Sequence, residues 1–126
     1  TSDNVRVRVN GDSGSNYSDH KLEGSGSAAS SYGFASTANF TANRIAAANA
    51  TASIFGAIVI DILDYASTSK NTTFRSFGGA DLNGSGFVFL DSGAWYNTNA
   101  VTSIRLAPNA TNWAQHSTAA LYGVRA

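Results

Sequence analysis

The chain of 126 residues contains no cysteine, no methionine and one proline. Without cysteine it has neither a disulfide framework nor thiol chemistry. Charged residues make up only 13% of the chain, and eight basic residues balance eight acidic ones. Binding of nucleic acids or anionic membranes requires a basic excess, so we expect neither as the main role.

Long hydrophobic runs are also missing. The longest apolar stretch, Ile54–Leu63, is too short to cross a bilayer and contains Asp61. We therefore expect no membrane insertion. Hydrophobic residues nevertheless reach 43% and aromatic residues 11%. Such a composition argues against intrinsic disorder and suits one globular domain over residues 1–126.

The chain begins at Thr1 and has no methionine anywhere. An intact translation product would begin with methionine. We therefore expect either that Thr1 arises by cleavage or that the chain is a segment of a longer protein, and the sequence leaves both open.

Short alternating segments dominate the first part of the chain. Val5, Val7 and Val9 alternate with polar residues, which predicts a strand with its valines toward a core. Turn-forming residues fill Asn10–Asn16, and we expect them to join this strand to a second one at Tyr17–Glu23 as a hairpin with a long loop.

The next thirty residues are harder to assign. Gly24–Ser36 is rich in Gly, Ser and Ala, and we expect a mobile loop there. Thr37–Ala42 predicts a weak strand. Arg44–Ser53 is rich in alanine but interrupted by polar residues, which favours a loop or a short helix.

The second half of the chain is a ladder of short apolar segments. Ile54–Tyr65 is the strongest predicted strand, and its β-branched residues favour a central position covered on both sides. Further strands are predicted at Asn71–Phe77, Gly86–Leu90, Thr102–Ala107 and Thr118–Val124. Turn residues separate them, including Gly78-Gly79. The pattern predicts an all-β fold, an antiparallel β-sandwich or jelly roll of about seven or eight strands with little helix.

Two candidate hydrolytic motifs fail on spacing. Gly11–Gly14 resembles the serine nucleophile motif of chymotrypsin-like proteases, where a histidine base precedes the serine, but His20 and His116 both follow it. Asp61 and Asp64 have an odd spacing, which puts them on opposite faces of a strand. We expect Asp61 to meet a hydroxyl or an arginine, and Asp64 to bind backbone amides of a turn. No catalytic residue is predicted.

The sequence Asp81–Gly86 matches the first half of a calcium loop, with Asp81, Asn83 and Ser85 at the alternate ligand positions. The twelfth position is Ser92 instead of a bidentate glutamate. A tight Asn-Gly turn between two strands explains the same residues. Calcium stays open at this point, and the sequence predicts no other metal and no cofactor.

Aromatic residues near loops are the candidates for recognition. Tyr32, Phe34, Trp95, Tyr96 and Trp113 lie among Asn, Asp and Ser residues. Aromatic rings stack on sugar faces while neighbouring amides bind hydroxyl groups, so these five could contact a ligand or receptor. The alternative is that such rings fill the open ends of a sandwich, because large aromatic side chains are usually mostly buried.

Several landmarks occur in an order that resembles a known group of proteins. They are Val7–Tyr17, Ile60–Tyr65, Ser69–Arg75, Gly93–Trp95, Asn99–Leu106, Asn112–Ser117 and the closing Leu121–Val124. In this order and spacing they resemble tail- or fibre-associated β-sandwich domains of tailed-bacteriophage virions. The pattern departs at Asn112–His116, where that group would have Phe and a Gly-containing turn.

The resemblance implies a function and a location. It implies a non-enzymatic structural or receptor-facing protein of a virion, in its tail or fibre, with a host surface glycan as a further partner. Fibres commonly have threefold symmetry, so the analogy favours a trimer that also contacts other virion proteins. Related domains usually carry a further strand or two before the first hairpin. The resemblance therefore implies either that the chain is the C-terminal part of such a domain or that a related chain completes its sheet. A capsid decoration or head-fibre protein, and a secreted carbohydrate-binding module, remain alternatives.

Overall fold

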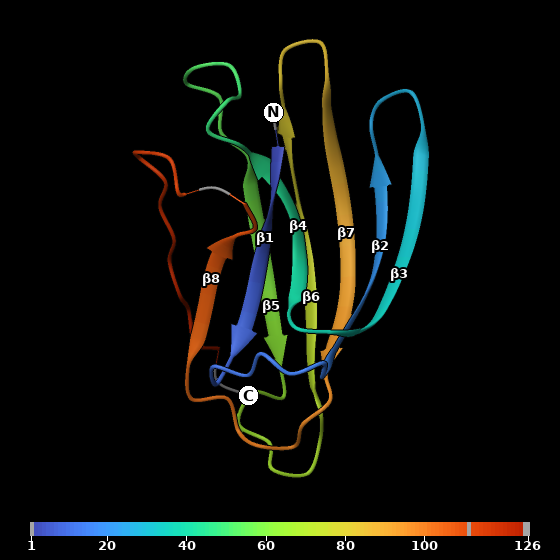
Figure 1. Cartoon of the computed structure of the whole chain (residues 1–126), viewed down its shortest axis with the longest axis vertical. Helices are drawn as coiled ribbons and strands as arrows, with labels where there is room; N and C mark the ends of the chain where they lie inside the picture. Colours follow the sequence, from blue (N-terminus) through green and yellow to red (C-terminus); the bar gives the residue numbers. More distant parts are fainter. Residues whose placement is uncertain (1, 111, 125–126) are drawn as a thin grey trace.

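A computed structural model describes residues 2–110 and 112–124. These residues form eight strands and no helix, in two antiparallel sheets that face each other as a β-sandwich (Figure 1). The predicted fold class is therefore confirmed. The strands are β1 (Ser2–Val9), β2 (Tyr17–Gly24), β3 (Ala29–Thr37), β4 (Phe40–Ala46), β5 (Ala57–Leu63), β6 (Thr72–Asp81), β7 (Gly86–Trp95) and β8 (Ile104–Pro108).

The two sheets differ in width. The smaller sheet has the strand order β4-β1-β8, and the larger one has the order β3-β2-β7-β6-β5. The strand β4 packs against β7, β6 and β2 of the larger sheet, whereas β3 extends beyond the smaller sheet. The wider sheet therefore has an inner surface that its partner does not completely cover.

The predicted hairpin between the first two strands is wrong. Strands β1 and β2 belong to different sheets, and the loop between them crosses from one layer to the other. The hydroxyl of Tyr17 accepts a hydrogen bond from the backbone N–H of Val9 at 3.1 Å, which joins the two sheets at this crossing. A turn-rich connection fits a crossing as well as a hairpin, because the residue pattern fixes the turn and not the partner strand.

The core lies where the two inner faces meet. Val5, Val7 and Val9 point inward and are buried, as their alternation predicts. Aromatic rings fill most of the remaining space: Phe40 and Phe74 stack with their ring centroids 5.0 Å apart, while Tyr17 contacts both Phe74 and Trp95. Such ring pairs add to the stabilisation that comes from apolar burial alone.

The prediction of a central strand at Ile54–Tyr65 is wrong. Its strand, β5, pairs only with β6 and is the edge of the larger sheet. Ile58, Ile60 and Ile62 pack against the core, but the opposite face of the strand is open to solvent. A continuous apolar run is typical of a strand covered on both sides, and among residues 2–110 and 112–124 nothing covers the outer face of β5.

Other segment boundaries also differ from the prediction. Most of the predicted loop Gly24–Ser36 forms the edge strand β3, and β4 includes the first part of the predicted loop or helix at Arg44–Ser53. The predicted strand Thr118–Val124 belongs to neither sheet. The turn expected at Gly78-Gly79 is wrong, because both residues lie inside β6. Glycine is needed at these positions because the neighbouring backbones approach too closely for a side chain.

Candidate interaction surface

The outer face of the larger sheet carries a row of exposed apolar side chains. Leu22, Leu90, Phe77 and Val59 are directly paired across β2, β7, β6 and β5. Their exposed fractions are 56%, 49%, 59% and 64%. Side chains paired in this way are neighbours on the sheet surface. The four residues, which we call the apolar row, therefore form one continuous strip.

Val88, two residues from Leu90 on β7, enlarges this strip on one side of the row. A large apolar side chain buries roughly 150 Å² when it is covered, so five that are half exposed present about 400 Å² to solvent. That is within the range of the largest apolar patch on a monomeric protein. Patches of this size mark interaction sites.

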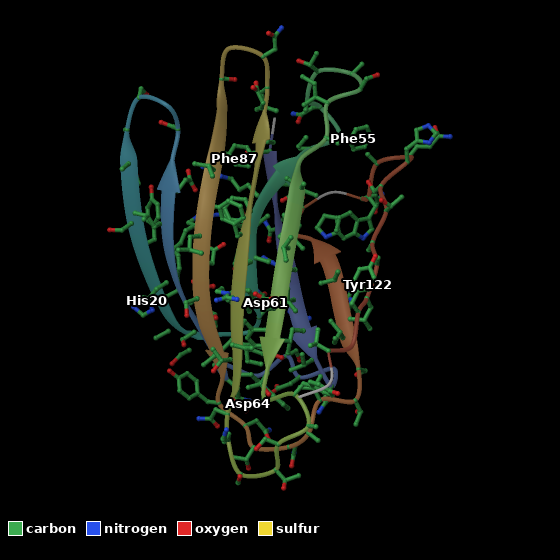
Figure 2. The ribbon with its side chains drawn as sticks, turned by 180° about the vertical axis from the view of Figure 1, so that it is seen from behind. His20, Phe55, Asp61, Asp64, Phe87 and Tyr122 are labelled. Atoms are coloured by element: carbon green, nitrogen blue, oxygen red, sulfur yellow. The ribbon has the colours of Figure 1, made fainter. Side chains whose placement is uncertain are left out.

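A polar row borders the apolar row on the same face. It consists of His20, Ser92, Arg75 and Asp61, again paired strand by strand. Arg75 donates two hydrogen bonds to Asp61 Oδ2, at 3.0 Å and 2.7 Å, so the expected arginine partner of Asp61 is confirmed. Figure 2 views this face, with His20 and Asp61 toward opposite edges of the sheet. Its charges are therefore largely neutralised within the chain.

Asp64 lies beyond the end of β5 and not beside Asp61 on the sheet face (Figure 2). Its carboxylate accepts a hydrogen bond from Lys70 Nζ at 3.0 Å, and its backbone carbonyl accepts one from Ser67. The expected turn is present, but the carboxylate binds a lysine and not the backbone amides. The two aspartates are not arranged as a catalytic pair.

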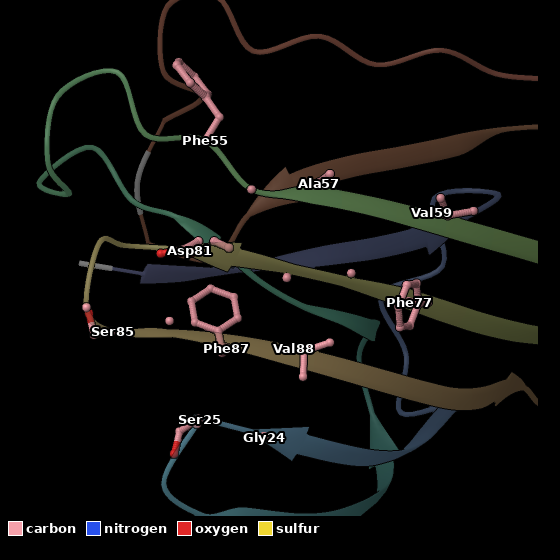
Figure 3. A pocket seen from close by; sticks show the side chains of 17 residues that line it. Gly24, Ser25, Phe55, Ala57, Val59, Phe77, Asp81, Ser85, Phe87 and Val88 are labelled. Atoms are coloured by element: carbon pink, nitrogen blue, oxygen red, sulfur yellow. The ribbon is translucent and has the colours of Figure 1, made fainter.

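On the other side, the apolar row borders a shallow groove of about 880 Å³. Phe55, Phe77 and Val88 line the groove together with Gly24 (Figure 3), and Gly79 also lines it. Gly79 must be glycine, because a Cβ atom there would lie 2.4 Å from the carbonyl oxygen of Phe87. Close backbone approach thus produces a surface depression lined mainly by apolar atoms.

Two of the five predicted contact residues share one strand. Tyr32 and Phe34 alternate on β3, on the side that faces the smaller sheet but extends beyond it. About half of each side chain is exposed, at 47% and 49%. The ammonium group of Lys21 lies 5.0 Å from the centroid of the Tyr32 ring. This aromatic pair with a neighbouring cation is open to solvent.

The other three candidates lie elsewhere. Trp95 is 1% exposed and belongs to the core, so its position agrees with the alternative that it fills the end of the sandwich. Tyr96 directly follows β7 and is exposed, and its hydroxyl accepts a hydrogen bond from Ser18. Trp113 is 45% exposed and lies in the segment that follows β8. The five aromatic residues therefore do not form one site.

The Gly11–Gly14 motif has a structural role in the loop that crosses between the sheets. Asp12 accepts hydrogen bonds from the Trp95 indole N–H at 2.7 Å, from Asn16 and from the backbone of Gly14. These hydrogen bonds, with that of Trp95 the largest contribution, lower the pKa of the Asp12 carboxyl below its usual value. The loop thereby holds the edge of the Trp95 ring.

Sequence reasoning missed a buried polar cluster between the sheets. Asp91 is 1% exposed and accepts hydrogen bonds from Ser76 Oγ at 2.7 Å and from Asn43 Nδ2 at 3.4 Å. Burial raises the pKa of the Asp91 carboxyl to about 6, against the smaller opposing effects of Ser76 and Lys21. Burial also raises the pKa of Asp19. Alternation along β7 could have indicated this burial, because Asp91 lies on the same face of the strand as residues that point inward.

The Asp81–Gly86 segment forms the tight turn that its Asn-Gly sequence predicts. Asn83 and Gly84 have φ angles of 59° and 92°, and Leu82 donates a backbone hydrogen bond to Ser85 at 2.8 Å. The carboxylate of Asp81 accepts the backbone N–H of Asn83 at 2.8 Å. These residues therefore serve the β6–β7 hairpin.

The described residues contain neither a metal-binding cluster nor a membrane-spanning helix. In residues 2–110 and 112–124, no group of three or more His, Cys, Asp or Glu side chains is placed to hold a metal ion. Within the same part of the chain, no helix has the length and hydrophobicity needed to span a membrane. Comparisons of the chain with protein-family models, with curated proteins and with solved structures find no match.

Proposed function

We propose that the chain is a non-enzymatic structural domain that assembles with copies of itself in the tail or fibre of a tailed phage. The apolar row on the outer face of the larger sheet carries this proposal. Its side chains come from four neighbouring strands and remain in solvent in the single chain. Covering such a surface is strongly favourable, and assembly is the means available to a β-sandwich.

Charge supports assembly between identical copies. The formal net charge is zero, and Arg75 and Asp61 beside the apolar row already form an ion pair. Two copies can therefore approach each other without long-range repulsion. The virion location rests on the resemblance to tail and fibre domains, and a trimer is the expected assembly. The alternative of a capsid decoration or head-fibre protein uses the same surface, and the position of the chain in a particle density map would distinguish the two.

Replacing Leu90 with glutamate tests the proposed assembly. Leu90 lies between Leu22 and Phe77, so a charge there should weaken self-association by at least about tenfold, or ~1.4 kcal/mol. Sedimentation velocity and native mass spectrometry over a range of concentrations would measure the change. Arg105→Glu is the control, since Arg105 is exposed on the outer side of β8 in the other sheet. A wild-type chain that stays monomeric at every concentration would contradict the proposal.

A second function, recognition of a host surface glycan, is favoured by the aromatic pair on β3. Tyr32 and Phe34 occupy an uncovered part of the inner face. Lys21 lies beside Tyr32 and pairs with Glu23 at 3.4 Å, and its ammonium group has further N–H groups that can donate to hydroxyl groups. Aromatic faces with nearby polar donors are the usual components of a sugar site. Tyr96 and Trp113 stay in the proposal as further exposed rings, whereas Trp95 is buried in the core. This site is separate from the apolar row, so assembly would present several copies of it.

The glycan proposal predicts that Tyr32→Ala combined with Phe34→Ala lowers binding to host polysaccharide by about tenfold or more, because two stacking surfaces are lost. Binding of the assembled protein to a panel of purified surface polysaccharides would be measured by biolayer interferometry. Tyr65→Ala provides the control, since Tyr65 is exposed to a similar extent beyond β5. Equal losses in the double variant and the control would show that Tyr32 and Phe34 have no special role.

A further inference from the structure

The segment Thr118–Val124 has the composition of a strand but pairs with neither sheet. Leu121, Tyr122 and Val124 are 81%, 84% and 83% exposed, more than any other large apolar side chain of the described residues. The segment passes outside β8 at the periphery of the molecule (Figure 1). We call it the exposed segment. Three large apolar side chains within four residues, all this exposed, indicate a segment that lacks its partner.

The four sheet edges differ in how well they are protected against an added strand. Strand β8 has five residues and ends at Pro108, which has no backbone N–H. Both β3 and β4 pair with their neighbours through an irregular register, and such bulges discourage further pairing. In contrast, β5 pairs with β6 in an unbroken register over seven residues without Gly, Pro or Lys. By these criteria β5 is the least protected edge.

The two faces of β5 match the two faces of the exposed segment. Ile58, Ile60 and Ile62 form one apolar face of β5, and Val59 and Leu63 belong to the other. In an extended segment, Leu121 points to one side, whereas Tyr122 and Val124 point to the other. The outer face of β5 also carries Asp61, between Val59 and Leu63, but Arg75 already pairs with it. A strand with apolar side chains on both faces therefore suits this edge, because its side chains would extend the isoleucine face and lie beside Val59 or Leu63 on the other.

We infer that the exposed segment of one copy adds as a β-strand to the free edge of β5 in a second copy. The inference rests on the proposed self-assembly and adds to the apolar row a second contact between copies. In the single chain, Tyr122 lies beyond β8, away from Asp61 on β5 (Figure 2), so the segment does not pair with its own edge strand. The contact joins unlike surfaces of two copies, and such contacts close into rings when the rotation between copies permits. Backbone hydrogen bonds would supply affinity and the alternating side chains the register.

The test compares two substitutions at one position of the full chain. Leu121→Pro removes a backbone N–H and prevents strand pairing, while Leu121→Thr removes the apolar side chain but keeps a residue suited to a strand. Neither should affect folding, because Leu121 is exposed and lies outside both sheets. We expect Leu121→Pro to weaken self-association about a hundredfold and Leu121→Thr by about tenfold or less. Sedimentation velocity would measure association, and circular dichroism would verify the fold.

Cross-linking identifies the two surfaces directly, because the chain has no cysteine of its own. Val59→Cys and Tyr122→Cys proteins would be mixed and treated with a short bis-maleimide. The expected product is a covalent dimer that contains one copy of each variant. Pairing Tyr122→Cys with Ser13→Cys, in the loop after β1, is the matched control and should give little of this product.

Each outcome has a defined meaning. Loss of association in Leu121→Pro, retention in Leu121→Thr and the mixed cross-link support strand addition. If the wild type assembles and Leu121→Pro assembles equally well, or if the two Leu121 variants lose association equally, strand addition is overturned while self-assembly stands. A wild-type chain that remains monomeric overturns both. Cross-linking to the Ser13 position as strongly as to Val59 would also overturn the choice of the β5 edge.

Discussion

Replacing Gly93 with alanine is expected to lower the free energy of unfolding by about 3 kcal/mol or more, at the upper end for an overpacked core. The added Cβ would lie 2.3 Å from the carbonyl oxygen of Ser18 and within 2.6 Å of the Phe40 ring. The first contact is backbone of the neighbouring strand β2. The second is a fully buried ring that stacks on Phe74, so it has little freedom to move. Urea unfolding followed by tryptophan fluorescence would measure the loss.

Gly24→Ala is the matched control for this substitution. Gly24 lies on β2 in the same sheet, and a Cβ there would meet only Val88 Cγ1 at 3.5 Å, an ordinary contact. Its effect should stay within about 1 kcal/mol, and less conformational freedom in the unfolded chain favours stabilisation. Similar destabilisation by both substitutions would show that a general sensitivity of strand glycines is responsible, and not the close approach at Gly93.

The alternation of apolar and polar residues predicted which segments form strands, but not which strands pair with each other. The repeating valines of β1 correctly predicted a strand with an inward face, since side chains alternate across any strand. Which strands become neighbours depends on contacts between distant parts of the chain. Tyr17 joins β2 to the end of β1 across the sandwich, and no local pattern distinguishes this arrangement from a hairpin. For the same reason, β5 was predicted to be a central strand, whereas it is the edge strand of the larger sheet.

The apolar row could not be predicted from the sequence, partly because two glycines of β6 are typical of a turn. Gly78 and Gly79 were expected to form a turn, so the predicted strand ended at Phe77. In the fold both residues belong to β6. Glycine is needed there because a Cβ at Gly78 would lie 2.2 Å from the carbonyl oxygen of Ala57. Close approach of neighbouring backbones requires glycine as strictly as a turn does. The apolar row is assembled from four strands, so its existence depends on register, which sequence alone does not determine.

For the five aromatic residues predicted to contact a ligand, the sequence likewise indicated the residue type but not the position in the fold. Their types suited ligand binding, yet only the fold separates the core residue Trp95 from the open pair on β3. Trp95 is the last residue of β7 and points inward, whereas Tyr96 directly follows the strand and is exposed. The hydrogen bond from the Trp95 indole to Asp12 spans 83 residues of sequence, which explains why no local signal indicated it.

The buried carboxylate of Asp91 should make the protein less stable at neutral pH than at mildly acidic pH. Burial raises its pKa in the folded state to about 6, whereas the value in the unfolded chain is near 3.8. The folded state therefore binds the proton more tightly, and the resulting cost is fully present above about pH 6 and disappears as the pH falls toward about 4. Lys21 opposes this rise, while the nearby Asp19 adds to it.

Asp91→Asn removes that titration and keeps the shape of the side chain. We expect the variant to exceed the wild type in unfolding free energy by roughly 2 kcal/mol at about pH 7, and the difference to vanish near pH 4. The introduced amide can accept from Ser76 through its oxygen. Once the Asn43 amide turns over, it can also donate to Asn43 Oδ1, a buried atom that has no hydrogen-bond partner among the described residues. Urea unfolding of both proteins across this pH range gives a difference curve, in which contributions of other carboxylates such as Asp12 cancel. A flat difference curve would mean that Asp91 keeps an ordinary pKa in the folded protein. A variant that is less stable at every pH would mean that its charge-assisted hydrogen bonds outweigh the cost of burying its charge.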